Sequence, residues 1–458
     1  MRENTDPEDF QQCLWNMFEY KFHAPLSPEQ VDRIRWHIFP EIRIEQGDLF
    51  EKNALPEKDV LKVMDIEQEK LARNLGAGHR VIHGVAGSGK TLILLHRCRY
   101  LAQQAKKLPA QKPILVLCFN IVLAKKLQSL IVDYGIAEQV RVHHFHGWCI
   151  AQLNEFGIGL INAPGPVYER QVASVIKAVK NGRIPGGQYG AVLVDEGHDF
   201  EKEWLELIVR MPDPDTENLL FLYDDAQSIY KNTNQLGFSL SEVGIKARGR
   251  TAILRLNYRN TDEIFYPAYR IGEQCFMGDQ VEDSLPVIQP KMAGRYGAKP
   301  EFKIYSSVSE ELGAVCSYLQ HWHDQGDQYW SSMCVLYRSG GAGKQLREAL
   351  QRAGIPVQWL STSEARKQFR PSLDAVVLMT MHSSKGLEFS NVIVHGINTL
   401  NDSSEAALRR EIQLLYVAMT RATDKLLLTA WQQNGMARRV QDAFGLDEVL
   451  CAEGGVPA

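Results

Sequence analysis

Short apolar runs alternate with longer amphipathic stretches along most of the chain. In the first half, apolar runs occupy residues 80–82, 114–119, 140–144, 191–194 and 219–222. Helix-like spacing follows several of these runs, for example over residues 92–102. Short apolar runs separated by helical segments are typical of a parallel sheet covered on both faces. The pattern therefore predicts an α/β lobe over residues 61–255.

The same alternation repeats in the second half of the chain. Apolar runs lie at residues 302–305, 333–337, 357–360, 375–379, 392–394 and 426–429, and helical spacing covers residues 345–353 and 411–422. We expect a second α/β lobe over residues 256–446 and a tail over 447–458. Prolines interrupt the helix-like stretches of residues 1–60, for which we expect a small helical N-terminal extension.

Composition adds few constraints. The 458 residues are 45% hydrophobic and 23% charged, with a net charge of −4, which is ordinary for a globular protein. A local positive groove is enough to bind nucleic acid, so this charge does not exclude such a partner. Eight cysteines without a CxxC pair, and an N-terminus without an apolar signal core, predict a reduced, cytoplasmic protein. No apolar stretch is long enough to span a bilayer, so we expect no membrane partner.

One segment matches the phosphate-loop pattern GxxxxGK[ST]. Its residues are Gly84, Val85, Ala86, Gly87, Ser88, Gly89, Lys90 and Thr91. The glycines let backbone N–H groups surround phosphate oxygens, and the following helix presents its positive end to the same anion. Lys90 would contact the β- and γ-phosphates, and Thr91 would bind Mg²⁺. A glycine-rich turn with a chance lysine is the alternative, but an apolar strand precedes the loop and a helix follows it.

An acidic pair follows the apolar run 191–194. Asp195 would hold Mg²⁺ through water, and Glu196 would orient and deprotonate the attacking water. Adjacent acids after a buried strand are costly unless a cation or hydrogen bonds offset them. A solvated acidic pair at a strand end is the alternative. After the next strand, Gln227 would contact the γ-phosphate or the attacking water and report nucleotide state.

Several segments resemble, in order, the boxes of the UvrD/Rep-like superfamily 1 helicases. They are 195–200 (DEGHDF, resembling DEAQDF), 224–230 (DDAQSIY, resembling DDDQSIY), 256–259 (LNYR), 380–389 (TMHSSKGLEF, resembling TxHxxKGLEF) and 416–422 (YVAMTRA, resembling YVAxTRA). The resemblance covers about residues 64–430. It implies two RecA-like P-loop NTPase lobes with parallel sheets and with ATP and Mg²⁺ between them.

The resemblance also implies roles for residues on the nucleotide side. Arg259 and Arg421 would be arginine fingers that neutralise charge on the transferred phosphoryl group when the lobes close. Gln68 and Tyr258 would contact adenine, and Gly386 and Glu388 would complete the nucleotide site. With Lys90, Glu196 and Gln227, the two arginines form the predicted catalytic set.

The predicted DNA-binding residues lie across both lobes. They are Phe119, Asn120, His144, Phe145, His146, Arg338, Thr380 and His382. Aromatic rings supply sequence-independent stacking, and polar groups hold phosphates. The spacing of His143, His144, His146 and Cys149 also allows a metal site, but the family places a DNA-contacting box here, and we favour DNA contact. Movement is expected in the 3′ to 5′ direction.

The sequence departs from the better-known family members at several places. Leu92 stands where they carry an adenine-contacting arginine, His144 replaces a threonine, and residues 231–233 replace a base-stacking tryptophan. About 40 residues separate Cys149 from Ala191, and about 40 separate Arg338 from Thr380. The accessory insertion at about 150–190 is therefore reduced, and the second lobe has no room for a large one.

These departures leave two functions open. The first is an ATP-dependent single-stranded DNA translocase or helicase in DNA repair, recombination or defence. The second is a nucleotide-gated subunit that binds DNA or a nuclease partner without processive unwinding. A small-molecule kinase would leave both arginines and the TxHxxKGLEF box without a role. The boxes also resemble a bacterial group in which a nuclease-related domain precedes a compact motor. Residues 1–60 show no such domain, so the expected partners are single-stranded DNA or junctions and, as a further candidate, a separately encoded nuclease.

Overall fold

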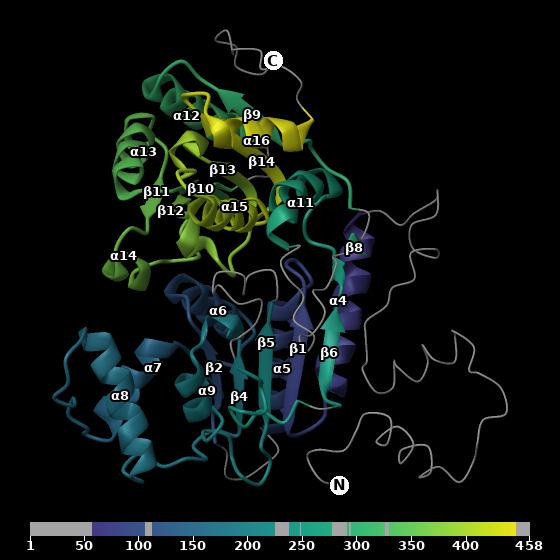
Figure 1. The fold of residues 1–458 in the computed structure, drawn as a ribbon. Helices are drawn as coiled ribbons and strands as arrows, with labels where there is room; N and C mark the ends of the chain where they lie inside the picture. Colours follow the sequence, from purple (N-terminus) through teal and green to yellow (C-terminus); the bar gives the residue numbers. More distant parts are fainter. Residues whose placement is uncertain are drawn as a thin grey trace, which may run out of the picture.

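The computed structural model describes residues 57–105, 112–224, 238–247, 249–276, 291–292, 295–325 and 329–445. These residues form two α/β lobes, each built around a six-stranded sheet (Figure 1). The expected fold class of two RecA-like lobes with parallel sheets is confirmed. Most of the predicted N-terminal extension, Gln227 and the tail at 447–458 lie outside the described residues.

The first sheet has the strand order β3-β2-β4-β5-β1-β6, and all neighbouring strands are parallel. Its strands are β1 (His79–Gly84), β2 (Ile114–Cys118), β3 (Val140–His144), β4 (Ala191–Val194), β5 (Leu219–Tyr223) and β6 (Thr251–Leu254). Strands β2, β4 and β5 are buried at every position, as expected for strands covered on both faces.

Helices cover both faces of this sheet. They are α4 (Glu57–Asn74), α5 (Lys90–Ala105), α6 (Ile121–Asp133), α7 (Phe145–Glu155), α8 (Val167–Lys180) and α9 (Lys202–Ile208). Between α7 and β4, α8 is the one helix, and it packs against α7 and α9 (Figure 1). The segment 150–190 is thus a small helical addition to the lobe.

The second sheet has the order β11-β12-β10-β13-β14-β9, again with parallel neighbours. Its strands are β9 (Glu301–Ile304), β10 (Met333–Tyr337), β11 (Val357–Trp359), β12 (Val376–Thr380), β13 (Phe389–Val394) and β14 (Ala422–Ala430). The short strands β7 (Leu256–Asn257) and β8 (Lys291–Met292) pair beside the lobe junction.

The helices of this lobe are α11 (Asp262–Phe276), α12 (Val308–Asp324), α13 (Gly340–Arg352), α14 (Ser363–Lys367), α15 (Glu405–Met419) and α16 (Gly435–Phe444). Helix α15 is buried at every position from Glu411 to Met419, because it packs on α11 and on the sheet. Its first turn is capped by Ser404, whose side chain accepts from Ala407 N. Within the described residues, no helix is both long and apolar enough to cross a membrane.

The lobes meet through α6 and the segment that follows β12. Asn120 caps α6, since its side-chain oxygen accepts from Val122 N. Its side-chain nitrogen donates to Ser383 O (2.8 Å) and Lys385 O (2.9 Å) of the second lobe. Helix α14 also packs against α6 (Figure 1). A single asparagine therefore joins the start of α6 to the other lobe.

Candidate nucleotide and nucleic-acid site

Three neighbouring strands of the first sheet end at the phosphate loop. Strand β5 lies between β4 and β1, so Asp224 follows it midway between Asp195 after β4 and the loop after β1. Carboxyl ends of parallel strands form the usual ligand-binding edge of an α/β sheet. The topology thus brings two acids, Asp195 and Asp224, to the same side of the phosphate loop.

Lys90 is almost completely buried and folds back on its own loop. Its Nζ donates to Gly84 O (2.7 Å) and Val85 O (2.9 Å) and lies 3.2 Å from Asp224 Oδ2. A buried ammonium needs such partners. Because the loop carbonyls and a carboxylate hold it here, a phosphate anion could replace them without leaving the charge unpaired.

The loop is packed from above by two residues predicted to contact adenine. Gln68 Nε2 donates to Ser88 O (3.1 Å) and to the hydroxyl of Tyr258 (2.5 Å). Gly89 has φ +80°, and a Cβ there would lie 2.0 Å from Gln68 Nε2. Glycine is therefore required both for the backbone turn and for the close approach of Gln68.

Polar atoms around the loop remain available for a ligand. Ser88 Oγ and Gln68 Oε1 are buried and make no hydrogen bond with any described residue. Buried polar atoms without partners are uncommon in native structures. With the buried Lys90, they fit a loop that binds a nucleotide.

Thr91 and Asp195 form the predicted metal-binding pair. Thr91 Oγ1 donates to Asp195 Oδ2 at 2.9 Å, and Asp195 is fully buried. Burial raises the pKa of Asp195, while the hydrogen bond from Thr91 and the charge of Lys90 lower it. A hydroxyl and a carboxylate side by side are the hard oxygen ligands that suit Mg²⁺, which keeps waters and phosphate oxygens as its other ligands.

Glu196 has a left-handed backbone (φ 52°) at the end of β4. Burial, with a further contribution from Asp195, raises the pKa of its carboxyl to about 8. Its Oε2 is buried without a hydrogen bond to a described residue. A carboxyl with a raised pKa and an open oxygen is suited to take a proton from water.

His198 lies against this carboxyl. Its Nδ1 accepts from Asp224 N (3.3 Å), so in the neutral ring the proton is on Nε2. That Nε2 lies 3.4 Å from Glu196 Oε2. Burial lowers the pKa of His198 to about 4, so the ring is neutral at pH 7. The imidazole therefore presents an N–H donor to the side of Glu196.

The two predicted arginine fingers converge on residues 387–388 of the second lobe. Arg259 Nη1 pairs with Glu388 Oε1. Arg421 donates to Leu387 O (3.1 Å) and Val417 O (2.9 Å) and pairs with no carboxylate among the described residues. It is also 4% exposed. A buried guanidinium held only by carbonyl oxygens and a hydroxyl keeps a charge that an anionic ligand would stabilise.

The segment 383–388 connects both lobes at the acidic pair. A Cβ on Gly386 would lie 3.2 Å from Glu196 Oε1. The neighbouring Lys385 Nζ forms an ion pair with Asp199 Oδ1 at 2.9 Å. Asn120, as described above, binds two carbonyls of the same segment. Movement of this segment would therefore change both the surroundings of Glu196 and the start of α6.

Some of the predicted DNA-binding side chains are accessible to solvent, whereas others are buried or already bonded to other residues of the protein. Phe119 is 40% exposed, His382 is exposed, and His144, His146 and Thr380 are partly exposed. Phe145 is fully buried, because the first turn of α7 directs its ring into the core. The ring therefore cannot stack on a DNA base in this conformation, and the predicted DNA contact of Phe145 is wrong for this conformation. The amide of Asn120 is already committed to the second lobe.

Arg338 is engaged in a different way. Its Nε and Nη2 form a bidentate pair with the buried Glu411 of α15, at 2.8 Å to 3.0 Å. Thr380 Oγ1 accepts from Ser383 N and caps the turn at 381–384. In this conformation the side chains of Arg338 and Thr380 therefore make hydrogen bonds within the second lobe.

The metal-site alternative at His143, His144, His146 and Cys149 gains no support. Cys149 is buried with a raised thiol pKa, caused by that burial. In the part of the chain that the structure describes, no group of three or more His, Cys, Asp or Glu side chains is placed to hold a metal.

Sequence reasoning missed four residues of this region. Asp224, His198 and Lys385 lie inside the segments that resemble helicase boxes, so their position in the sequence could have indicated that they belong to the site. Trp204 of α9 had none. It stacks between Phe145 and Phe119, with ring centres 4.6 Å and 6.1 Å away.

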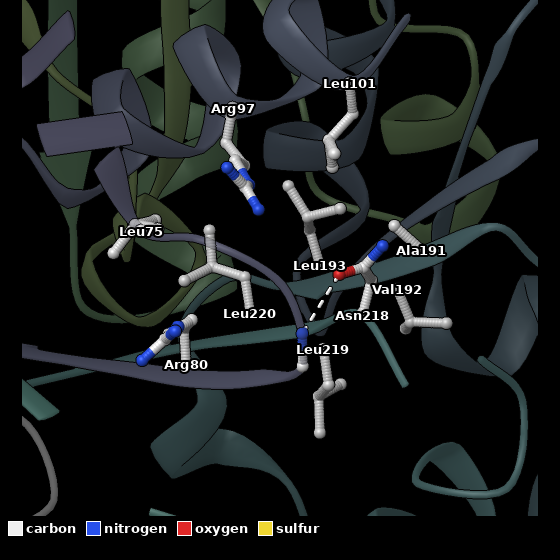
Figure 2. Close-up of a pocket in the computed structure, with 11 residues that line it drawn as sticks. Leu75, Arg80, Arg97, Leu101, Ala191, Val192, Leu193, Asn218, Leu219 and Leu220 are labelled. Carbon is white, nitrogen blue, oxygen red and sulfur yellow. Dashed lines mark hydrogen bonds between the residues drawn. The ribbon is translucent and has the colours of Figure 1, made fainter. Parts of the chain in front are cut away.

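A separate pocket lies at the opposite edge of the first sheet. Figure 2 shows it at the amino ends of β1, β4 and β5, where Asn218 accepts from Gly78 N (3.1 Å). Leucine side chains and the stems of Arg80 and Arg97 line it. Its position, away from the phosphate loop, separates it from the nucleotide site.

The fold and the site define a two-lobed P-loop NTPase. Residues 67–233 match the profile of an AAA domain, and residues 358–433 match the UvrD-like helicase C-terminal domain. A Mycoplasma genitalium protein described as "Probable DNA helicase II homolog" is 36% identical over 86 residues, which are 18% of this chain and 12% of that protein. DNA helicase II of Escherichia coli K12 is 44% identical over 62 residues, covering 12% of this chain and 9% of that protein. These matches place the chain among the UvrD/Rep-like superfamily 1 helicases.

The shared regions are short. They span about a tenth of the length of these curated relatives. A solved C-terminal domain of a possible DNA helicase from Lactobacillus plantarum WCFS1 aligns with 41% of this chain and 95% of its own length, at 22% identity. Its TM-score of 0.31 is too low to bear on the fold.

Proposed function

We propose that this protein is a DNA-dependent ATPase that moves along single-stranded DNA, in the 3′ to 5′ direction, as a translocase or helicase. The observation that carries the proposal is the position of segment 383–388. Its Gly386 lies beside Glu196, its Lys385 pairs with Asp199, and its backbone carbonyls accept hydrogen bonds from Asn120. One segment thus joins the ATP site to the neighbour of Phe119, an exposed ring among the predicted DNA contacts.

The chemistry assigned to the first lobe is phosphoryl transfer to water. Lys90 would move from its loop carbonyls to the phosphates, and Thr91 and Asp195 would hold Mg²⁺. Bound Mg²⁺ neutralises charge on the phosphate oxygens. Glu196 would accept the proton of the attacking water through its open Oε2. Gln227 is the residue we assign to sensing the γ-phosphate.

The second lobe supplies positive charge to the same reaction. Arg421 carries a buried charge without a carboxylate partner among the described residues, and Arg259 exchanges Glu388 for the nucleotide. Gln68 and Tyr258 cover the loop and contact adenine. Because both arginines are attached to segment 387–388, hydrolysis and release change the contacts of the segment that also binds Asn120. That linkage is how turnover would move the lobes relative to a bound strand.

The track assigned to the protein is single-stranded DNA or the single-stranded part of a junction. Phe119, His146 and His382 offer rings and polar groups to it, and Thr380 lies at the same junction. DNA repair, recombination or defence in the cytoplasm is the proposed setting. Five cysteines, Cys98, Cys118, Cys149, Cys316 and Cys334, are buried and free, as a reducing compartment would leave them.

A second candidate is a nucleotide-gated subunit that clamps DNA or a separately encoded nuclease. The small size of the accessory segments favours it: α8 alone stands between α7 and β4, and α13, β11 and α14 stand between β10 and β12. Such a protein would hydrolyse ATP to release its partner without displacing strands.

ATP turnover with and without single-stranded DNA tests the proposal. We expect DNA to stimulate wild-type turnover, and Lys90→Ala and Glu196→Gln to abolish it. Lys70→Ala, which alters an exposed ion pair with Glu67 on α4, is the matched control and should behave as wild type. A rate that neither DNA nor RNA changes would overturn the proposal.

A further inference from the structure

Three stacked rings run from the core of the first lobe to its surface at the lobe junction. Phe145 is buried, and Trp204 lies on it with 4.6 Å between ring centres and 20° between planes. Phe119 continues the stack at 6.1 Å and 15°, and it is the exposed outer member. Two rings therefore hold Phe119 from behind and fix its orientation.

His146 extends this group sideways. Its ring meets Phe119 edge to face at 5.8 Å and Trp204 at 5.2 Å. On its other side it meets Tyr168 at 5.5 Å, with 81° between the planes. Tyr168 stands in the first turn of α8 and is 50% exposed. We call Phe119, Trp204, His146 and Tyr168 the aromatic strip.

The charge around the strip favours bases over phosphates. Burial lowers the pKa of His146, so at pH 7 the ring is neutral. The carboxylate of Glu169 is close enough to raise the pKa of the Tyr168 hydroxyl, with a smaller contribution from Glu201. Acidic neighbours repel a phosphate backbone, whereas they leave the face of a ring available for stacking.

The position of the strip indicates the ligand. It begins at Phe119, directly before Asn120, which binds the second lobe. It leads from there to α8, which Figure 1 places on the side of the first lobe away from β1 and β6. A strand that crosses the lobe junction over Phe119 would meet His146 and Tyr168 next.

We propose that Tyr168 is a further base-stacking residue, which takes an unpaired nucleobase of single-stranded DNA beside the base that stacks on Phe119. This inference rests on the proposed function and extends it to a residue outside the recognised boxes. The contact is independent of base identity, because every base offers a π face. Helix α8 is then part of the DNA-binding surface.

The test is equilibrium binding of a fluorescent oligo(dT) of about 15 nucleotides, the size range of single-strand sites. Tyr168→Ala and Tyr168→Leu should raise Kd about fivefold to 150-fold, the range for losing one stacked base, while Tyr168→Phe should retain affinity. Leucine keeps the apolar bulk, so it separates stacking from packing. Tyr266→Ala removes an equally exposed tyrosine, 52% exposed on α11, and should bind as wild type.

A scan of single abasic positions in the oligonucleotide identifies the contact. One position should weaken wild-type binding and have no further effect in Tyr168→Ala. If wild type binds DNA and Tyr168→Ala binds equally well, Tyr168 has no stacking role, although the proposed function stands. A stacking role is also overturned if Tyr168→Ala loses affinity equally for oligo(dT) and for a fully abasic strand. If wild type binds no DNA, both the stacking role and the proposed function fail together.

Discussion

The imidazole Nε2 of His198 lies 3.4 Å from Oε2 of Glu196, and its Nδ1 accepts the backbone N–H of Asp224. One ring thus spans the ends of β4 and β5. Its Nε2 lies within reach of the proposed base without forming a hydrogen bond in this conformation, and the ring is neutral at pH 7. We infer that His198 is a positioning residue for Glu196.

Replacing His198 tests this relationship. His198→Ala should lower kcat for ATP about tenfold to a hundredfold with little change in KM, since the loss of orientation costs less than the loss of a general base. His198→Gln should restore most of the rate, because its amide both accepts from Asp224 N and donates to Glu196. Equal rates for wild type and His198→Ala would contradict the role.

Glu196 should also make stability depend on pH. Its folded pKa is raised above the unfolded value, so the folded state binds more protons between about pH 4.5 and 8, and stability falls as pH rises through that window. Glu196→Gln removes this effect. The variant should be more stable than wild type at pH 8, on the order of 1 kcal/mol or more, with a smaller difference at pH 5. Denaturant unfolding at both pH values measures it, and a difference independent of pH would argue against the buried carboxyl.

The ion pair between Lys385 and Asp199 should couple DNA binding to turnover. Lys385→Met and Asp199→Asn should each reduce DNA stimulation about tenfold, and the double variant should be no worse than the poorer single one, as expected for coupled neighbours. The exposed pair Lys202–Glu242 is the control. Additive losses in the double variant would show that the two residues act separately.

Arg421 should act as a finger and Arg409 should not. Arg421→Ala should lower kcat about a thousandfold by removing charge from the transition state. Arg409→Ala breaks an exposed pair with Glu405 on the same chain segment and should leave turnover unchanged. A comparable loss in both variants would point to damage of α15 and its surroundings.

Local patterns predicted eleven of the twelve strands of the two sheets, because each of these is a short apolar run that is read directly from the sequence. Strand β6 (Thr251–Leu254), at the edge of the first sheet, was not among the predicted runs. The contact of Thr91 with Asp195 follows from strand ends that share one edge of the sheet. The partners of Lys90 could not be derived in the same way, since the strand order that puts Asp224 beside it is a property of the assembled sheet.

Burial explains most of the remaining differences on the DNA side. Phe145 and His146 are adjacent in sequence, yet the first is fully buried in the core and the second is only half-buried. Arg338 is paired with Glu411, which is 73 residues away in the chain. Residues so distant in the chain meet only through tertiary packing, so the local spacing of residues does not predict such a pair. Tyr168 and Trp204 likewise reach Phe119 and His146 only through tertiary packing, so the sequence alone did not indicate them.

Displacement of streptavidin from biotinylated single strands is the most direct test of an ATP-driven motor. With ATP, wild type should strip streptavidin from the 5′ end much faster than from the 3′ end, and Lys90→Ala should strip neither. DNA-stimulated ATP turnover without displacement from either end would contradict translocation and support the nucleotide-gated clamp.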